Sequence, residues 1–72
     1  MKISYDKESD ALYVQLNDII PDGVVEIHDE INLDVSEDGK IYGIEILNAS
    51  DKIDLHTLYT YTIDEETVLS IK

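Results

Sequence analysis

The sequence predicts a mainly β fold: an antiparallel β-meander of five to seven strands, with room for one short helical turn after Ser50. Three observations support this fold class. Apolar and polar residues alternate over much of the chain, which is the period of a half-buried strand. Short clusters of Asp, Gly, Pro and Ser separate these runs, as expected where tight turns join strands. Residues 31–50 hold the clearest hairpin, because alternating apolar runs flank Asp38-Gly39.

An Asp-Gly pair favours a two-residue type I′ turn, since both central positions of that turn need positive φ. With the turn at Asp38-Gly39, one face of the hairpin pairs Val35 with Tyr42, Leu33 with Ile44 and Ile31 with Ile46. The other face pairs Ser36 with Ile41, Asp34 with Gly43 and Asn32 with Glu45. A slip of one residue would mix the two faces, so the register is well specified. Gly43 lies opposite Asp34, where space for a side chain is limited.

Three earlier segments also alternate. Residues 2–5 and 11–16 predict a first hairpin with a loop of about four residues. Residues 24–28 predict a third strand after the turn sequence Pro21-Asp22-Gly23, which combines a fixed φ with a permissive glycine.

The C-terminal part is harder to interpret. Ser50 can cap a helical turn over residues 51–56, and the Thr, Tyr and Ile residues of 57–63 favour a sixth strand. Residues 64–72 form either a loose tail or an extra strand over Thr67–Ile71.

All 72 residues form a single small β-rich domain, near the lower size limit for independent folding. One face of the predicted sheet collects Ile3, Tyr5, Leu12, Val14, Leu16, Val25, Ile27, Ile31, Leu33, Val35, Tyr42, Ile44 and Ile46. A single sheet cannot bury such a face without a cover, which either the C-terminal segment or a second copy of the sheet would supply.

The formal net charge is −12, from 17 acidic and 5 basic residues. This charge excludes nucleic acids and anionic membranes as expected partners, because both are bound through clustered Lys and Arg. The sequence has no cysteine, no apolar run of membrane-spanning length and no secretory signal, so we expect a cytoplasmic protein without a cofactor.

Two stretches resemble a known family. Tyr5–Val14 matches the pattern Y-D-x-E-x-D-A-L-Y-[IV], and Glu37–Ser50 matches E-D-G-x-[LIV]-x-G-I-E-I-L-[DN]-A-S. Both resemble the prokaryotic domain of unknown function 2283 family. The resemblance implies a small β-rich fold in a bacterial or archaeal cytoplasm, and gene neighbours that look like small toxins. It implies no activity.

The opposite face of the predicted sheet also carries apolar residues among its charges. These are Tyr13, Val24, Ile41 and Leu47. Apolar patches of this kind mark contact surfaces, so we expect either a homo-oligomer or a small basic protein as the partner.

The alternative is a cation- or small-ligand-binding domain. Residues 34–45 nearly fit the calcium loop of an EF-hand, but their flanks alternate like strands rather than helices. A weaker cation site would use Asp34, Asp38 and Glu45 on the hairpin.

No nucleophile with an adjacent base, phosphate-binding glycine loop or histidine pair at a metal-ligand spacing is visible. We therefore expect a non-catalytic interaction module, antitoxin-like towards a small basic partner. An enzyme would need a cleft at a dimer seam.

Overall fold

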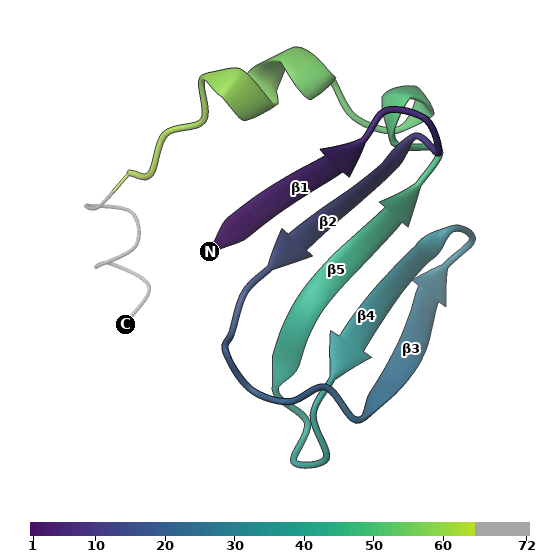
Figure 1. Ribbon diagram of the computed structural model, residues 1–72, viewed down its shortest axis with the longest axis vertical. Helices are drawn as coiled ribbons and strands as arrows, with labels where there is room; N and C mark the ends of the chain where they lie inside the picture. Colours follow the sequence, from purple (N-terminus) through teal and green to yellow (C-terminus); the bar gives the residue numbers. More distant parts are fainter. Residues whose placement is uncertain (65–72) are drawn as a thin grey trace.

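A computed structural model describes residues 1–64, which form one five-stranded antiparallel sheet followed by two short 3-10 turns (Figure 1). The strands are β1 (Lys2–Asp6), β2 (Ala11–Gln15), β3 (Gly23–His28), β4 (Ile31–Val35) and β5 (Ile41–Leu47), and the turns are η1 (Ala49–Asp51) and η2 (Leu55–Tyr59). The mainly β, antiparallel fold class is confirmed. The predicted seventh strand lies outside the described residues.

The strand order is β1-β2-β5-β4-β3, so β2 pairs with β5 rather than with β3. This order differs from consecutive pairing at one connection, residues 16–22, which carries the chain from β2 to the far edge of the sheet (Figure 1). Backbone N–H groups of Leu16 and Asn17 donate to the Tyr42 carbonyl, and the Asp22 N–H donates to the Val35 carbonyl at 2.8 Å. The connection is therefore hydrogen-bonded to the turn end of the β4–β5 hairpin.

The β4–β5 turn has one residue more than predicted. The Ser36 N–H donates to the Lys40 carbonyl at 2.8 Å, and the Gly39 N–H donates to the Ser36 carbonyl at 3.0 Å. In this turn only Gly39 has positive φ, at 86°. The type I′ prediction is therefore wrong. A three-residue turn ending in a left-handed glycine joins the strands instead.

A β-bulge then compensates for the extra turn residue. Val35 lies opposite Ile41, but the next pair is Asp34 with Gly43, so the register shifts by one residue between them. Beyond the bulge, the pairs Leu33–Ile44, Asn32–Glu45 and Ile31–Ile46 are those that the sequence predicts.

The bulge exchanges two neighbouring residues between the faces of the sheet. Ile41 pairs with Val35 and shares its face, because directly opposed residues point to the same side. The ring of Tyr42 lies instead 6.4 Å from that of Tyr13, on the opposite side. The predicted faces of Ile41 and Tyr42 are therefore both wrong.

The predicted sixth strand is also wrong. Asp54 caps η2 by accepting the His56 N–H at 3.0 Å, and its carbonyl accepts both the N–H and the hydroxyl of Thr57. These local bonds give the backbone an alternative to pairing with a strand. In place of the single helical turn predicted over residues 51–56, the chain forms two 3-10 turns, η1 and η2, and Asn48 rather than Ser50 occupies the N-cap of η1.

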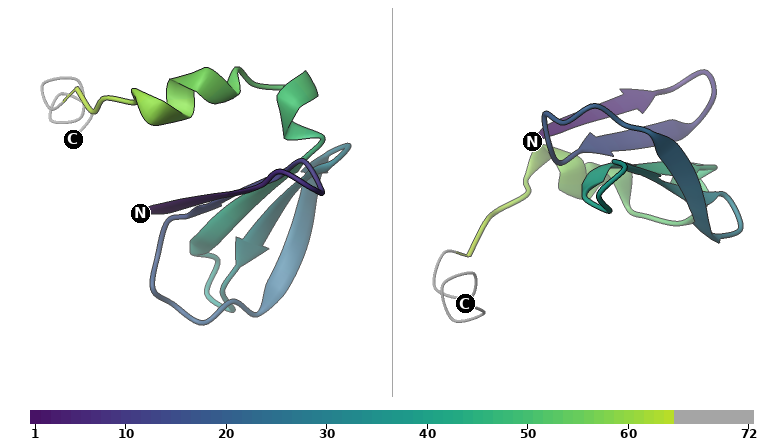
Figure 2. Two further views of the ribbon diagram at one scale, coloured as in Figure 1. Left: turned by 45° about the horizontal axis from the view of Figure 1, so that its top comes forward. Right: turned by 90° about the horizontal axis from the view of Figure 1, so that it is seen from below.

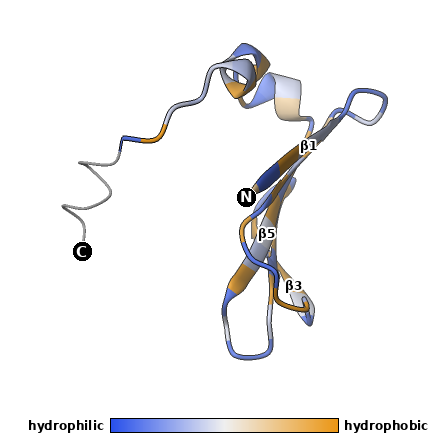
Figure 3. Ribbon diagram, turned by 60° about the vertical axis from the view of Figure 1, so that its left-hand side comes forward, coloured by the Kyte–Doolittle hydropathy of each residue, from blue (hydrophilic) through white to orange (hydrophobic). Residues whose placement is uncertain are grey.

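The sheet forms a single layer, as the views of Figure 2 and the nearly edge-on view of Figure 3 show. We call residues 48–64 the C-terminal arm. It begins beside the β3–β4 turn, where Asn48 and Lys52 donate to Glu30, and then follows β1 (Figure 1). Consequently Leu12 and Ala49 are the only hydrophobic side chains of the described part that are buried, at 3 % and 0 % exposure. No helix within residues 1–64 is long and apolar enough to cross a membrane.

Candidate functional site

The two faces of the sheet differ in chemistry, and the strand register defines both. We call the face formed by two cross-strand rows the apolar face. Its rows are Ile3–Val14–Ile44–Leu33–Val25 and Tyr5–Leu12–Ile46–Ile31–His28, extended by the pair Val35 and Ile41. A bulge between Glu26 and His28 places His28 in this row, on the face where the sequence predicts Ile27. The polar face carries, among others, the row Ser4–Tyr13–Glu45–Asn32–Glu26. The rows of the apolar face contain no Asp, Glu, Lys or Arg.

Much of the apolar face remains accessible. Val25 is 50 % exposed, Ile41 39 % and Tyr5 37 %, and Leu12 is the only buried member. Most of the others are half-buried. Sheets ordinarily bury such a face against a second layer. In the described part of the chain the C-terminal arm lies beside β1, with which it lines a cavity (Figure 3).

Acidic side chains surround the apolar face at both ends of the strands. One end carries Asp18, Asp22, Glu37 and Asp38 in its loops, and the other carries Glu8, Asp29, Glu30, Asp51 and Asp54. Two of the lysines are already ion-paired: Lys40 with Asp38 at 3.9 Å and Lys52 with Glu30 at 2.8 Å. The surface is therefore apolar in the middle and anionic at its ends.

Tyr13, one of the four predicted contact residues, is held within the polar face. Its hydroxyl donates to Asp34 at 2.5 Å, and its ring covers Gly43 so closely that a Cβ there would lie 2.6 Å from Cζ. Burial, followed by the bond to Asp34, raises the pKa of Tyr13 far above the ordinary phenol value. The sequence predicts limited space at Gly43 from its position opposite Asp34, and the structure shows that the ring of Tyr13 fills this space.

The other three predicted contact residues do not join Tyr13 in one patch. Val24 is 66 % exposed and lies opposite Asp34 on the polar face, whereas Leu47 is half-buried in the row of Ala11. Ile41 belongs to the apolar face. The structure therefore distributes these residues and concentrates exposed apolar surface elsewhere.

The three candidate cation ligands each have a separate partner. Asp34 accepts from Tyr13, Glu45 accepts from Asn32 at 3.2 Å, and Asp38 accepts from Ser36 in the turn. No group of three or more metal-binding side chains occurs within residues 1–64. The geometry of Asp34, Asp38 and Glu45 thus gives no support to a cation site.

Asp10 joins the β1–β2 turn to the C-terminal arm. Its carboxylate accepts the hydroxyl of Tyr5 at 2.6 Å and the hydroxyl of Ser50 at 2.7 Å, and its carbonyl accepts the Ala49 N–H. The bonds from Tyr5 and then from Ser50 lower the pKa of Asp10. Similarly, Lys52 and then Asn48 lower the pKa of Glu30. These carboxylates therefore join the β1–β2 and β3–β4 turns to the C-terminal arm.

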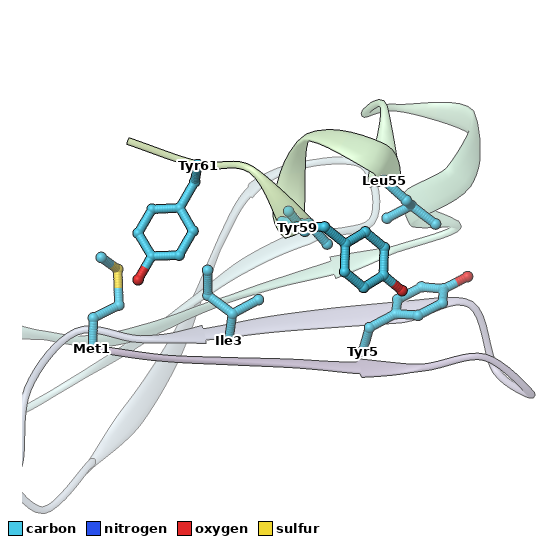
Figure 4. A pocket seen from close by; sticks show the side chains of 7 residues that line it. Met1, Ile3, Tyr5, Leu55, Tyr59 and Tyr61 are labelled. Carbon is cyan, nitrogen blue, oxygen red and sulfur yellow. The ribbon is translucent and has the colours of Figure 1, made fainter. Parts of the chain in front are cut away.

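A cavity of about 400 Å³ lies between β1 and the arm (Figure 4). Its lining residues are Met1, Ile3, Tyr5, Leu55, Leu58, Tyr59 and Tyr61. In Figure 4 the ring of Tyr59 stands near that of Tyr5, and the hydroxyl of Tyr61 points towards Met1. The lining side chains are four aliphatic residues and three tyrosines, so the cavity combines apolar surface with phenol hydroxyl groups.

Comparison with known proteins gives one match. A family model described as "Protein of unknown function (DUF2283)" matches residues 2–50, which span the whole sheet and most of η1. No curated protein and no solved structure matches the chain.

Proposed function

Because the chain belongs to the DUF2283 family of proteins of unknown function, its family supplies no activity, and we propose a function from its surface: a non-catalytic protein-interaction module. The observation that carries this proposal is the apolar face, on which β3, β4 and β5 present side chains without a second layer from the described residues. Large accessible apolar patches on small proteins mark contact surfaces. A 72-residue chain also gains most from burying further area in a complex.

The partner we propose is a small basic protein. The net charge of −12 and the acidic loops at both ends of the apolar face favour a cationic surface. An antitoxin-like role towards a small toxin, which the family resemblance suggests, is one form of this proposal. Charge complementarity would accelerate association and make the complex sensitive to salt.

The absence of a catalytic role is part of the proposal. The carboxylates with the most distinct environments, Asp10 and Glu30, each accept hydrogen bonds from structural neighbours. Asp34 is likewise held by Tyr13.

A capture experiment tests the proposal. The full chain, tagged, is incubated with lysate of its native host at low salt, washed and eluted with a salt step, and the eluate is identified by mass spectrometry. We expect one small basic protein, released by salt. Enrichment of nothing but the bait, or a partner whose retention does not depend on salt, would contradict the proposal.

A further inference from the structure

Resting on the proposed function, we infer that the partner covers the apolar face with an amphipathic helix whose two ends carry Lys or Arg. Within residues 1–64 no second layer covers the side chains of β3, β4 and β5, and a sheet face is ordinarily covered either by helices or by another sheet.

The dimensions of the face suit a helix. The seven residues of β5 extend about 23 Å at 3.3 Å per residue. A helix of about 15 residues has the same length at 1.5 Å per residue. The outer strands of a five-stranded sheet are about 19 Å apart, which is wide enough for one or two helices with their side chains.

The charges favour a helix of this kind, rather than a second copy of the chain, as the element that covers the apolar face. Two copies packed face to face would carry a net charge of 2 × −12 = −24, with their acidic loops facing across a gap of about 10 Å. An amphipathic helix with basic ends would instead place an apolar stripe on the rows of Leu33 and Ile31 and its cations near Glu37 at one end and Asp29 at the other. A strand added at β1 or β3 would extend the sheet and leave the face uncovered.

Two adjacent valines of β3 provide a matched test of the surface. Val25 pairs with Leu33 on the apolar face, whereas Val24 pairs with Asp34 on the polar face. They are 50 % and 66 % exposed, so the substitutions V25K and V24K add the same charge to similarly accessible sites. If V25K lowers the melting temperature markedly more than V24K does, the threonine variants V25T and V24T are used in place of the two lysine variants.

The probe is a synthetic 15-residue peptide with Leu at every third or fourth position and two Lys at each end, and its control is a scrambled peptide of identical composition. Both are titrated into the isotope-labelled full chain and followed by NMR. We expect a helical complex with shifts centred on Leu33 and Ile44, at least tenfold weaker binding of the scrambled peptide, at least tenfold loss in V25K, and less than a twofold change in V24K.

Equal binding of both peptides, shifts centred on the polar face, equal effects of V25K and V24K, or no binding would each overturn the inference. The lysate capture repeated with both variants separates this result from the proposed function. If V25K and V24K retain a basic partner equally, the proposed function stands, but the assignment of the apolar face as its binding surface is contradicted. Binding of the peptide without capture of any partner contradicts the proposed function and leaves the chemistry of the face established.

Discussion

The substitution Gly43→Ala tests the contact at the middle of the sheet. The ring of Tyr13 lies over Gly43, and an added Cβ would stand 2.6 Å from Cζ and 2.8 Å from Cε2 of that ring. These separations are far below van der Waals contact, so the ring must move. Because its hydroxyl donates to Asp34 at 2.5 Å, displacement of the ring also breaks this hydrogen bond. The backbone contributes no strain, since Gly43 is not among the positive-φ residues.

The expected cost has two parts. Overpacking of this kind costs about 1–3 kcal/mol. A lost hydrogen bond to a charged group adds about 1.5 kcal/mol, because Tyr13 and Asp34 can regain water at the surface. The sum of about 2.5–4.5 kcal/mol is a large part of the ~4–11 kcal/mol expected for the free energy of unfolding of 72 residues. At about 4–8 °C per kcal/mol, we therefore expect the melting temperature to fall by roughly 10–35 °C.

Thermal and urea unfolding followed by circular dichroism measure this change, with Gly23→Ala as the control. At Gly23 an added Cβ would meet no atom within 4 Å, and the φ of this residue is not positive. Its substitution is therefore expected to change the free energy of unfolding by less than ~1 kcal/mol. A double-mutant cycle with Tyr13→Ala isolates the clash, because removing the ring removes its cause. The reasoning is refuted if Gly43→Ala costs no more than Gly23→Ala, or costs as much without the Tyr13 ring as with it.

Three further predictions concern ionisation and ligands. The pKa of Tyr13 is raised, so its stabilising contribution is complete below about pH 10 and is lost as the pH rises through the folded-state value; in an absorbance titration at 295 nm two tyrosines should ionise late, since the bond to Asp10 also raises the pKa of Tyr5, and Tyr13→Phe should remove the later of the two. The pKa values of Asp10 and Glu30 are lowered, so their contribution is present above about pH 4 and is lost as the pH falls through the lower, folded-state values; Asp10→Asn should flatten the dependence of melting temperature on pH between 5 and 2, and an unchanged slope would count against the Asp10–Ser50 link. Calcium at about 1 mM should leave the melting temperature unchanged, since a bound cation would raise it by mass action, and a rise that Asp34→Asn removes would restore the cation-binding alternative.

The sequence predicts well those strand pairs that depend on the alternation of apolar and polar residues. Ile31, Leu33, Ile44 and Ile46 pair as expected because a slip would expose them, and that requirement outweighs the details of the turn. The turn itself depends on a choice between two- and three-residue loops, which alternation does not determine. The extra residue places Ile41 and Tyr42 on the faces opposite to those predicted, which moves one predicted contact residue onto the apolar face.

The rest of the fold depends on interactions between distant residues. Pairing of β2 with β5 is stabilised by Tyr13 on Gly43, and nothing in either segment alone identifies the other. The C-terminal arm has strand-like composition, yet Asp54 and Thr57 satisfy its backbone locally. The sequence likewise indicates which residues are apolar, whereas the strand order and the bulge decide which face each of them joins, as Ile41 shows.

The residues that carry the family resemblance have two roles: some join separate parts of the chain, and others form the centre of the apolar face. Their polar members, such as Asp10 and Ser50, join separate parts of the chain. Their apolar members include Leu12, Val14, Ile44 and Ile46, which lie side by side on β2 and β5 at the centre of the apolar face. In an independent domain the centre of such a face would be its core, but here Leu12 alone of these four is buried. The apolar half of this signature thus forms the centre of the apolar face, where Val14, Ile44 and Ile46 are half-buried.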